Sequence, residues 1–136
     1  MTGLDEVAEA ALGLAEVVEG ERYGNRAWSV GGKTFAWERP FSKADLKRFG
    51  AGVPPAGPIL AVRVQDLSEK EAVLAAPPAG FFTIPHFDGY AAVLVELGAA
   101  APDAVREAVV DGYLACAPSR LAERHLEDRP PAGDSA

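Results

Sequence analysis

Apolar residues recur at helical spacing between Thr2 and Gly20, with acidic residues among them on the other face. Thr2 is a candidate N-cap with Asp5 three residues later, and Gly20 is a natural stop. The same spacing returns after Pro102, in a segment that Pro118 ends. The pattern therefore predicts an amphipathic helix near each end of the chain, the second followed by a further helical turn or two.

Two shorter segments carry a capping box, in which a serine and an acidic residue three positions later bond each other's backbone N–H groups. Ser42 with Asp45 predicts a short helix that Gly50 ends. Ser68 with Glu71 predicts another, which a pair of prolines ends. Capping explains both serines without a catalytic role.

The pair Gly31–Gly32 separates two short alternating runs and predicts a hairpin with a two-residue turn. The resulting register pairs Trp28 with Phe35 and Arg26 with Trp37. We expect the face that carries Trp28, Phe35 and Trp37 to be buried. On that face Arg26 would lie over Trp37 as a cation–π contact.

Two further strand signals follow. Residues Ile59–Val64 alternate as a half-buried strand does. Asp88–Gly89 predicts a second hairpin, whose register pairs Phe82 with Val95. Pro85 cannot donate to a strand ladder, so the first strand of this hairpin is expected to be irregular or at a sheet edge.

Separated hairpins with helices between them predict an α+β fold, in which an antiparallel sheet of hairpins carries helices packed on one face. We expect a single domain over residues 1–126 and a disordered tail over residues 127–136. No apolar run approaches the roughly 20 residues that span a bilayer, and the first residues are acidic rather than basic. We therefore expect a cytoplasmic monomer that does not enter a membrane.

The chain has 13 Lys and Arg against 20 Asp and Glu, a formal net charge of −7. This argues against a protein that binds polyanions over its whole surface. Residues 23–50 reverse the balance, with six bases against two acids. They form either an ordinary solvated face or the surface on which nucleic acid would bind. The six bases are Arg26, Lys33, Arg39, Lys43, Lys47 and Arg48.

Three motifs, "VGGKTFAW", "FFTIPHFDGY" and "YLACAPSRL", occur in this order and resemble the MmcQ/YjbR family from about Leu4 to Leu121. The resemblance implies a CyaY-like α+β fold and a DNA-binding protein whose two hairpins act as a double wing. On this sequence the wings are the hairpins at Gly31–Gly32 and Asp88–Gly89. Because Asp88 puts an acid at the second tip, the basic hairpin and short helix of residues 23–50 would make the contacts with double-stranded DNA.

The alternative is a non-enzymatic interaction domain with no nucleic-acid role, which binds a small molecule or a protein through an aromatic-rimmed cleft. The second hairpin supports this alternative, because both of its faces are apolar. The face that is turned away from the core must therefore be covered by helices or by a binding partner. The motif residues that would form the turn and cleft are Trp37, Pro85, His86, Phe87, Asp88, Gly89 and Tyr90.

Catalytic and metal chemistry has little support in the sequence. His86 and Asp88 would share a strand face and could supply two metal ligands, but a site needs three or four. His86 is otherwise a rim histidine that fixes the turn by a hydrogen bond. Cys116 ends an apolar helical stripe and is expected to be a buried structural thiol. No nucleophile motif or phosphate-binding loop is present, so we expect no cofactor and no catalytic residues.

Overall fold

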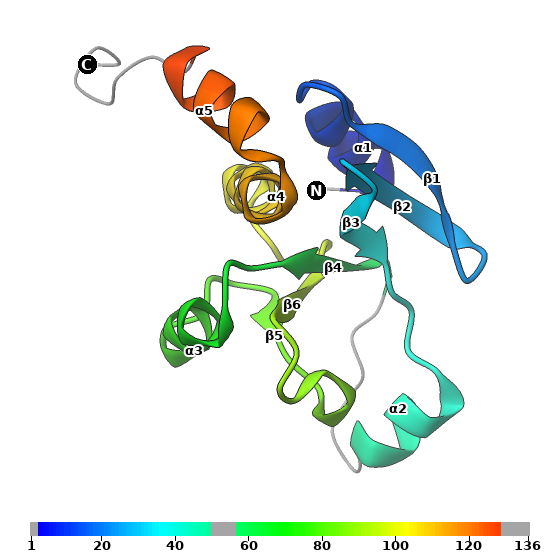
Figure 1. Cartoon of the computed structure of the whole chain (residues 1–136). Helices are drawn as coiled ribbons and strands as arrows, with labels where there is room; N and C mark the ends of the chain where they lie inside the picture. Colours follow the sequence, from blue (N-terminus) through cyan, green and yellow to red (C-terminus); the bar gives the residue numbers. More distant parts are fainter. Residues whose placement is uncertain (1–2, 50–56, 129–136) are drawn as a thin grey trace.

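The computed structural model describes residues 3–49 and 57–128, and of residues 48, 49 and 128 the backbone alone. Figure 1 shows a sheet with helices around it. The helices are α1 (Leu4–Leu12), α2 (Lys43–Phe49), α3 (Leu67–Ala75), α4 (Pro102–Cys116), α5 (Ser119–Asp128) and the 3₁₀ helix η1 (Pro85–Phe87). The strands are β1 (Val18–Arg22), β2 (Asn25–Val30), β3 (Lys33–Glu38), β4 (Ile59–Arg63), β5 (Phe81–Phe82) and β6 (Ala92–Glu96).

Within the described ranges the six strands form one antiparallel sheet in the order β1-β2-β3-β4-β6-β5. This confirms the α+β class. Strand β4 was expected to be half-buried, but four of its five residues are buried because it is paired on both sides and covered on both faces. In the same ranges no helix combines the length and the apolar composition needed to cross a membrane.

Helices α1 and α4 lie on the same side of the sheet, and between them and the sheet is the first core. Its centre holds the fully buried Trp28, Phe35 and Tyr113. The helix α4 approaches the sheet closely at Gly112, where a Cβ atom would lie 2.8 Å from Val62 Cγ1. A larger residue there would push helix and sheet apart.

The opposite face of the sheet carries a second, smaller core that contains Trp37, Ile84, Phe87 and Leu94. It is covered by the segment between β5 and β6, with Phe41 packed against it. The second apolar face of the predicted second hairpin is therefore covered largely by the segment between β5 and β6 and not by a partner.

The first helix was predicted to reach Gly20, which is wrong. Helix α1 ends at Leu12, with Gly13 as its C-cap, and residues Val18–Arg22 form the edge strand β1 instead. Strand β1 pairs with β2 along its whole length, from the pair of Val18 with Ser29 onwards. Ladder hydrogen bonds to a strand later in the chain outweigh the local helical pattern there.

The first hairpin has the predicted turn but not the predicted register. A bulge between Trp28 and Ser29 leaves Phe35 out of the pairing, so that Trp28 pairs with Ala36. The extra residue moves Trp37 to the second core, while Trp28 and Phe35 stay in the first. The prediction that all three aromatics share one face was wrong.

The capping box of α2 is confirmed, whereas that of α3 lies elsewhere than predicted. In α2, Asp45 N–H donates to Ser42 Oγ at 3.1 Å. In α3 the N-cap is Asp66, whose side chain accepts from Glu69 N–H at 2.8 Å, and not Ser68. The helix begins at Leu67, one residue before Ser68, so the residue that precedes Leu67 is the N-cap, and this residue is Asp66. Gly50 and residues 129–136 lie outside the described residues, and α5 extends to Asp128.

The second hairpin is much shorter than predicted. Its first strand, β5, has two residues at the sheet edge, where Phe82 pairs with Leu94 rather than Val95. From Pro85 the chain turns into η1, because proline suits the first turn of a helix and cannot donate to a ladder. An irregular strand or one at the sheet edge was expected here and is confirmed. The prediction that this strand stays paired with β6 up to the turn at Asp88–Gly89 was wrong.

Candidate functional site

A cavity of about 550 Å³ opens on the face of the sheet that carries the second core. We call it the aromatic pocket. Three segments line it: the turn between β1 and β2, the end of β3 with the residues that lead into α2, and η1 with the loop after it. The lining residues are Arg22, Tyr23, Asn25, Trp37, Glu38, Arg39, Pro40, Ser42, His86, Phe87 and Tyr90. The volume is in the range of small-molecule sites.

Three aromatic rings form the inner walls of the aromatic pocket. The Trp37 ring centroid lies 6.4 Å from that of Phe87 and 6.3 Å from that of Tyr90, and Phe87 and Tyr90 meet edge to face at 5.6 Å. Trp37 and Phe87 are 4% and 3% exposed, so they also belong to the second core, while Tyr90 is half-buried. The walls are therefore held in place by core packing.

Arg22 brings a positive charge to this pocket. Its guanidinium carbon lies 4.6 Å from the Trp37 ring centroid and 5.8 Å from that of Tyr23. Within the described part of the chain no ion pair involves Arg22. The expected cation–π contact on Trp37 is thus made by Arg22 rather than by Arg26.

The second arginine in the lining is neutralised locally. Arg39 lies 2.8 Å from the Asp45 carboxylate, which is buried and also accepts from Ser42 N–H at 2.9 Å. Burial raises the pKa of Asp45, but the hydrogen bonds from Ser42 and Arg39 outweigh it and hold the pKa below 3.8. Arg39 therefore joins α2 to the end of β3, with its guanidinium 5.6 Å from the Phe87 ring centroid.

A buried lysine holds the loop that carries two of the aromatic walls. Lys70, on α3, is 7% exposed, and its Nζ donates to the backbone carbonyls of Phe87 and Tyr90. These carbonyls flank the Asp88–Gly89 turn. Burial lowers the pKa of Lys70, and the Asp88 carboxylate opposes that shift.

His86 lies on the exposed side of the same loop and lines the pocket, with its ring 6.1 Å from that of Phe87. Asp88 is exposed, its N–H donates to Pro85 O, and Gly89 has the positive φ of 75° that the turn requires. His86 therefore lies in η1 and not on a strand face shared with Asp88. Across residues 3–49 and 57–128 no three metal-ligating side chains come together.

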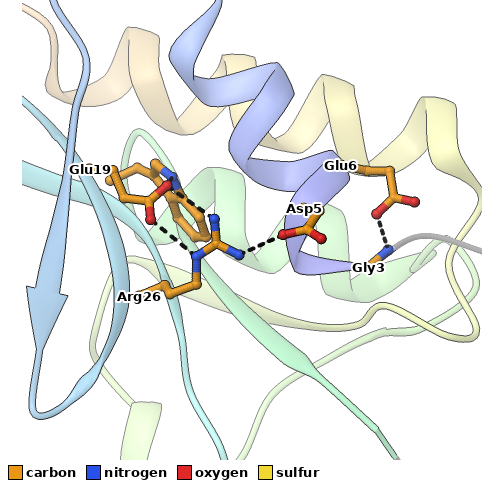
Figure 2. Close-up of polar contacts among 6 residues, drawn as sticks. Gly3, Asp5, Glu6, Glu19 and Arg26 are labelled. Carbon is orange, nitrogen blue, oxygen red and sulfur yellow. Dashed lines mark hydrogen bonds and ion pairs between the residues drawn. The ribbon is translucent and has the colours of Figure 1, made fainter.

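Arg26, the first residue of the predicted nucleic-acid surface, is held by two carboxylates (Figure 2). It bonds Asp5 at 3.0 Å and Glu19 through two nitrogens, at 3.1 and 3.2 Å. Glu19 also accepts from the indole N–H of the buried Trp28 at 2.9 Å. The cluster joins α1, β1 and β2 on the face opposite to the aromatic pocket.

The other predicted bases do not gather around Arg26. Lys33 begins β3 and Arg39 follows its end, so the length of the strand separates them. Lys43 and Lys47 are exposed on α2, which lies away from the sheet at the bottom of Figure 1. The side chain of Arg48 lies outside the described part.

Cys116 is the expected buried thiol. It is 6% exposed in the first core, and burial raises its pKa, against the smaller opposing influence of Arg63 and Lys33. A thiol held in its protonated form is a poor nucleophile.

A family model described as YjbR matches residues 12–115. The chain belongs to the YjbR family. This confirms the resemblance that the three motifs indicated. The "Uncharacterized protein Rv2570" of Mycobacterium tuberculosis and the "Uncharacterized protein Mb2600" of Mycobacterium bovis are similar to it. Each is 40% identical over 129 residues, which cover 93% of this chain and 97% of the relative. No solved structure matches it significantly.

The sequence of this YjbR-family chain predicted the aromatic walls but did not identify Arg22, Tyr23 or Lys70 as residues of the site. Arg22 is the last residue of β1, so its position depends on a strand that the sequence pattern had predicted as a helix. The one local signal for β1 is Gly24, because a glycine at the second position of a two-residue hairpin turn readily takes positive φ. Nothing in the local sequence distinguishes Lys70 from an exposed helical lysine.

Proposed function

We propose that this YjbR-family domain is a non-enzymatic binding module, and that a small molecule with an aromatic ring binds in the aromatic pocket. The observation that carries the proposal is the pocket itself, about 550 Å³ in volume with Trp37, Phe87 and Tyr90 as its walls. Ring–ring contacts at 4.5–7 Å are favourable in proteins, about 0.5–1.5 kcal/mol each beyond the area they bury. Walls held by core packing bind a ring without first having to be ordered.

Double-stranded DNA is the second candidate, and the placement of the bases favours it less. Arg26 and Arg39 are already neutralised by carboxylates, and Lys33 lies far from α2. Lys43 and Lys47 remain as exposed cations on one helix. Two phosphate contacts give only weak binding, because the electrostatic part of the affinity grows with the number of phosphates that are neutralised.

The two tryptophans of the chain make the small-molecule proposal directly testable. Trp37 lines the aromatic pocket, while Trp28 is buried in the first core and serves as an internal control. The ¹⁵N-labelled protein would be titrated with indole, indole-3-acetate, indole-3-acetamide, adenosine and AMP, and both indole N–H signals followed by NMR. We expect at least one compound to shift the Trp37 signal saturably and leave Trp28 in place. A Trp37 signal that no compound moves would overturn the proposal.

A further inference from the structure

We infer that the aromatic pocket selects a planar ligand that carries an anionic group, with Arg22 as the anion-binding residue and Tyr23 as an outer stacking wall. The inference rests on the proposed function and names the class of ligand. The anionic group is a carboxylate or a phosphate, which share the planar, bidentate recognition that a guanidinium provides.

The environment of Arg22 supports the first half of this inference. The guanidinium carbon lies 4.6 Å from the Trp37 ring centroid, a cation–π contact that uses the charge of the group but none of its N–H donors. It is half-buried, and the part of the chain that the structure describes offers it no ion-pairing carboxylate. A partly desolvated cation that has no carboxylate partner among residues 3–49 and 57–128 is suited to bind an anion.

The other charges in the lining do not compete for that anion. Arg39 is neutralised by Asp45 at 2.8 Å. Glu38 follows Trp37 directly in β3 and pairs with Leu60, a first-core residue, so strand alternation directs its side chain to the opposite face. Of the two arginines in the lining, Arg22 is therefore the one that is left to bind an anionic group.

Tyr23 shows a feature that folding alone does not explain. It is 91% exposed and has φ of 53°, in the left-handed region that bulky residues rarely adopt. With Gly24 at φ 80° and the pair Arg22 with Asn25, it forms a two-residue hairpin turn, where Asn is the usual residue in its place. A strained, exposed tyrosine at the mouth of an aromatic pocket is placed to stack on a bound ring.

The test uses matched pairs of probes that differ in the anionic group. Indole-3-acetate is compared with indole-3-acetamide, and AMP with adenosine, by titration of the intact chain with the Trp37 signal as readout. We expect the anion to bind about tenfold more tightly than its neutral partner. If only one pair shows the preference, that pair identifies carboxylate or phosphate as the group bound.

Three variants assign the roles. Arg22→Gln should abolish the preference, so that the anionic and the neutral probe bind equally well, whereas Arg22→Lys should retain part of it. Tyr23→Asn should weaken both members of a pair equally, while the thermal midpoint stays level or rises because Asn suits the turn. A thermal unfolding curve of each variant, recorded under the same conditions as that of the unaltered chain, shows whether a loss of binding is due to a loss of folding.

The outcomes distinguish the two levels of the proposal. Equal binding of anion and neutral partner by the unaltered chain would overturn the anion inference and leave the proposed function standing. An anion preference that survives Arg22→Gln would overturn the assignment to Arg22. A Trp37 signal that responds to none of the probes would overturn both.

Discussion

Lys70 donates from its buried Nζ to the backbone carbonyl of Tyr90 at 2.8 Å, twenty residues further along the chain. The same nitrogen also donates to the carbonyl of Phe87. A single ammonium group thus joins α3 to both ends of the turn that follows η1. The loop that carries two walls of the aromatic pocket depends on a helix that does not line the pocket.

The first prediction concerns this contact. Lys70→Met keeps much of the side-chain volume but leaves two carbonyls without their charged donor, which should lower the free energy of unfolding by about 2 kcal/mol. Urea unfolding followed by tryptophan fluorescence measures the loss. As a control, Glu71→Gln on the exposed side of α3 should change stability by less than about 0.5 kcal/mol. A Lys70→Met variant as stable as its parent would show that the contact does not hold the loop.

Asp45 should make stability depend on pH in the acid range. Because its folded pKa lies below the unfolded value of 3.8, its contribution is complete above pH 3.8 and is lost as the pH falls through the folded pKa. Asp45→Asn should cost about 2 kcal/mol at neutral pH, and the difference from the parent should shrink below pH 3.8. Unfolding curves at a series of pH values measure this. A difference that does not vary with pH would contradict the assignment.

The cluster around Arg26 predicts unequal effects for its two acids. Glu19→Ala removes the acceptor of the buried Trp28 indole N–H and should cost about 1–2 kcal/mol. Asp5→Ala removes only an ion pair whose carboxylate is almost fully exposed, worth less than about 0.5 kcal/mol. Thermal unfolding of the two single variants gives the comparison. Equal losses would mean that the indole hydrogen bond contributes nothing.

The arrangement of the bases predicts that duplex DNA is not retained at about 0.15 M salt. A gel-shift experiment with a labelled duplex tests this, first at low salt and then at physiological ionic strength. Lys43→Glu combined with Lys47→Glu is the informative variant, and Lys33→Glu at the far end of β3 is its matched control. A complex that persists at physiological salt and is lost only in the α2 double variant would restore the DNA interpretation.

The sequence by itself determined the elements whose signals are local. The capping box of Ser42 with Asp45, the start of α4 at Pro102 and the turn at Gly31–Gly32 each depend on residues within a few positions of one another. The motif around residues 81–90 indicated the family and most of the aromatic walls. In these three elements short-range hydrogen bonding and backbone sterics agree with the rest of the fold, whereas the equally local signals at Ser68 and Gly20 were overridden by it.

Only the tertiary structure decided where the pocket and its charge lie. Strand β1 exists because it pairs with β2, and that pairing brings Arg22 onto Trp37. One extra residue at the β2–β3 bulge moved Trp37 from the first core to the second, which alternation alone could not show. The partners of Arg26 and Lys70 likewise come from other elements. Register and side-chain pairing between distant segments are properties of the whole packed sheet, so the local pattern identified the residues of the site but not their arrangement.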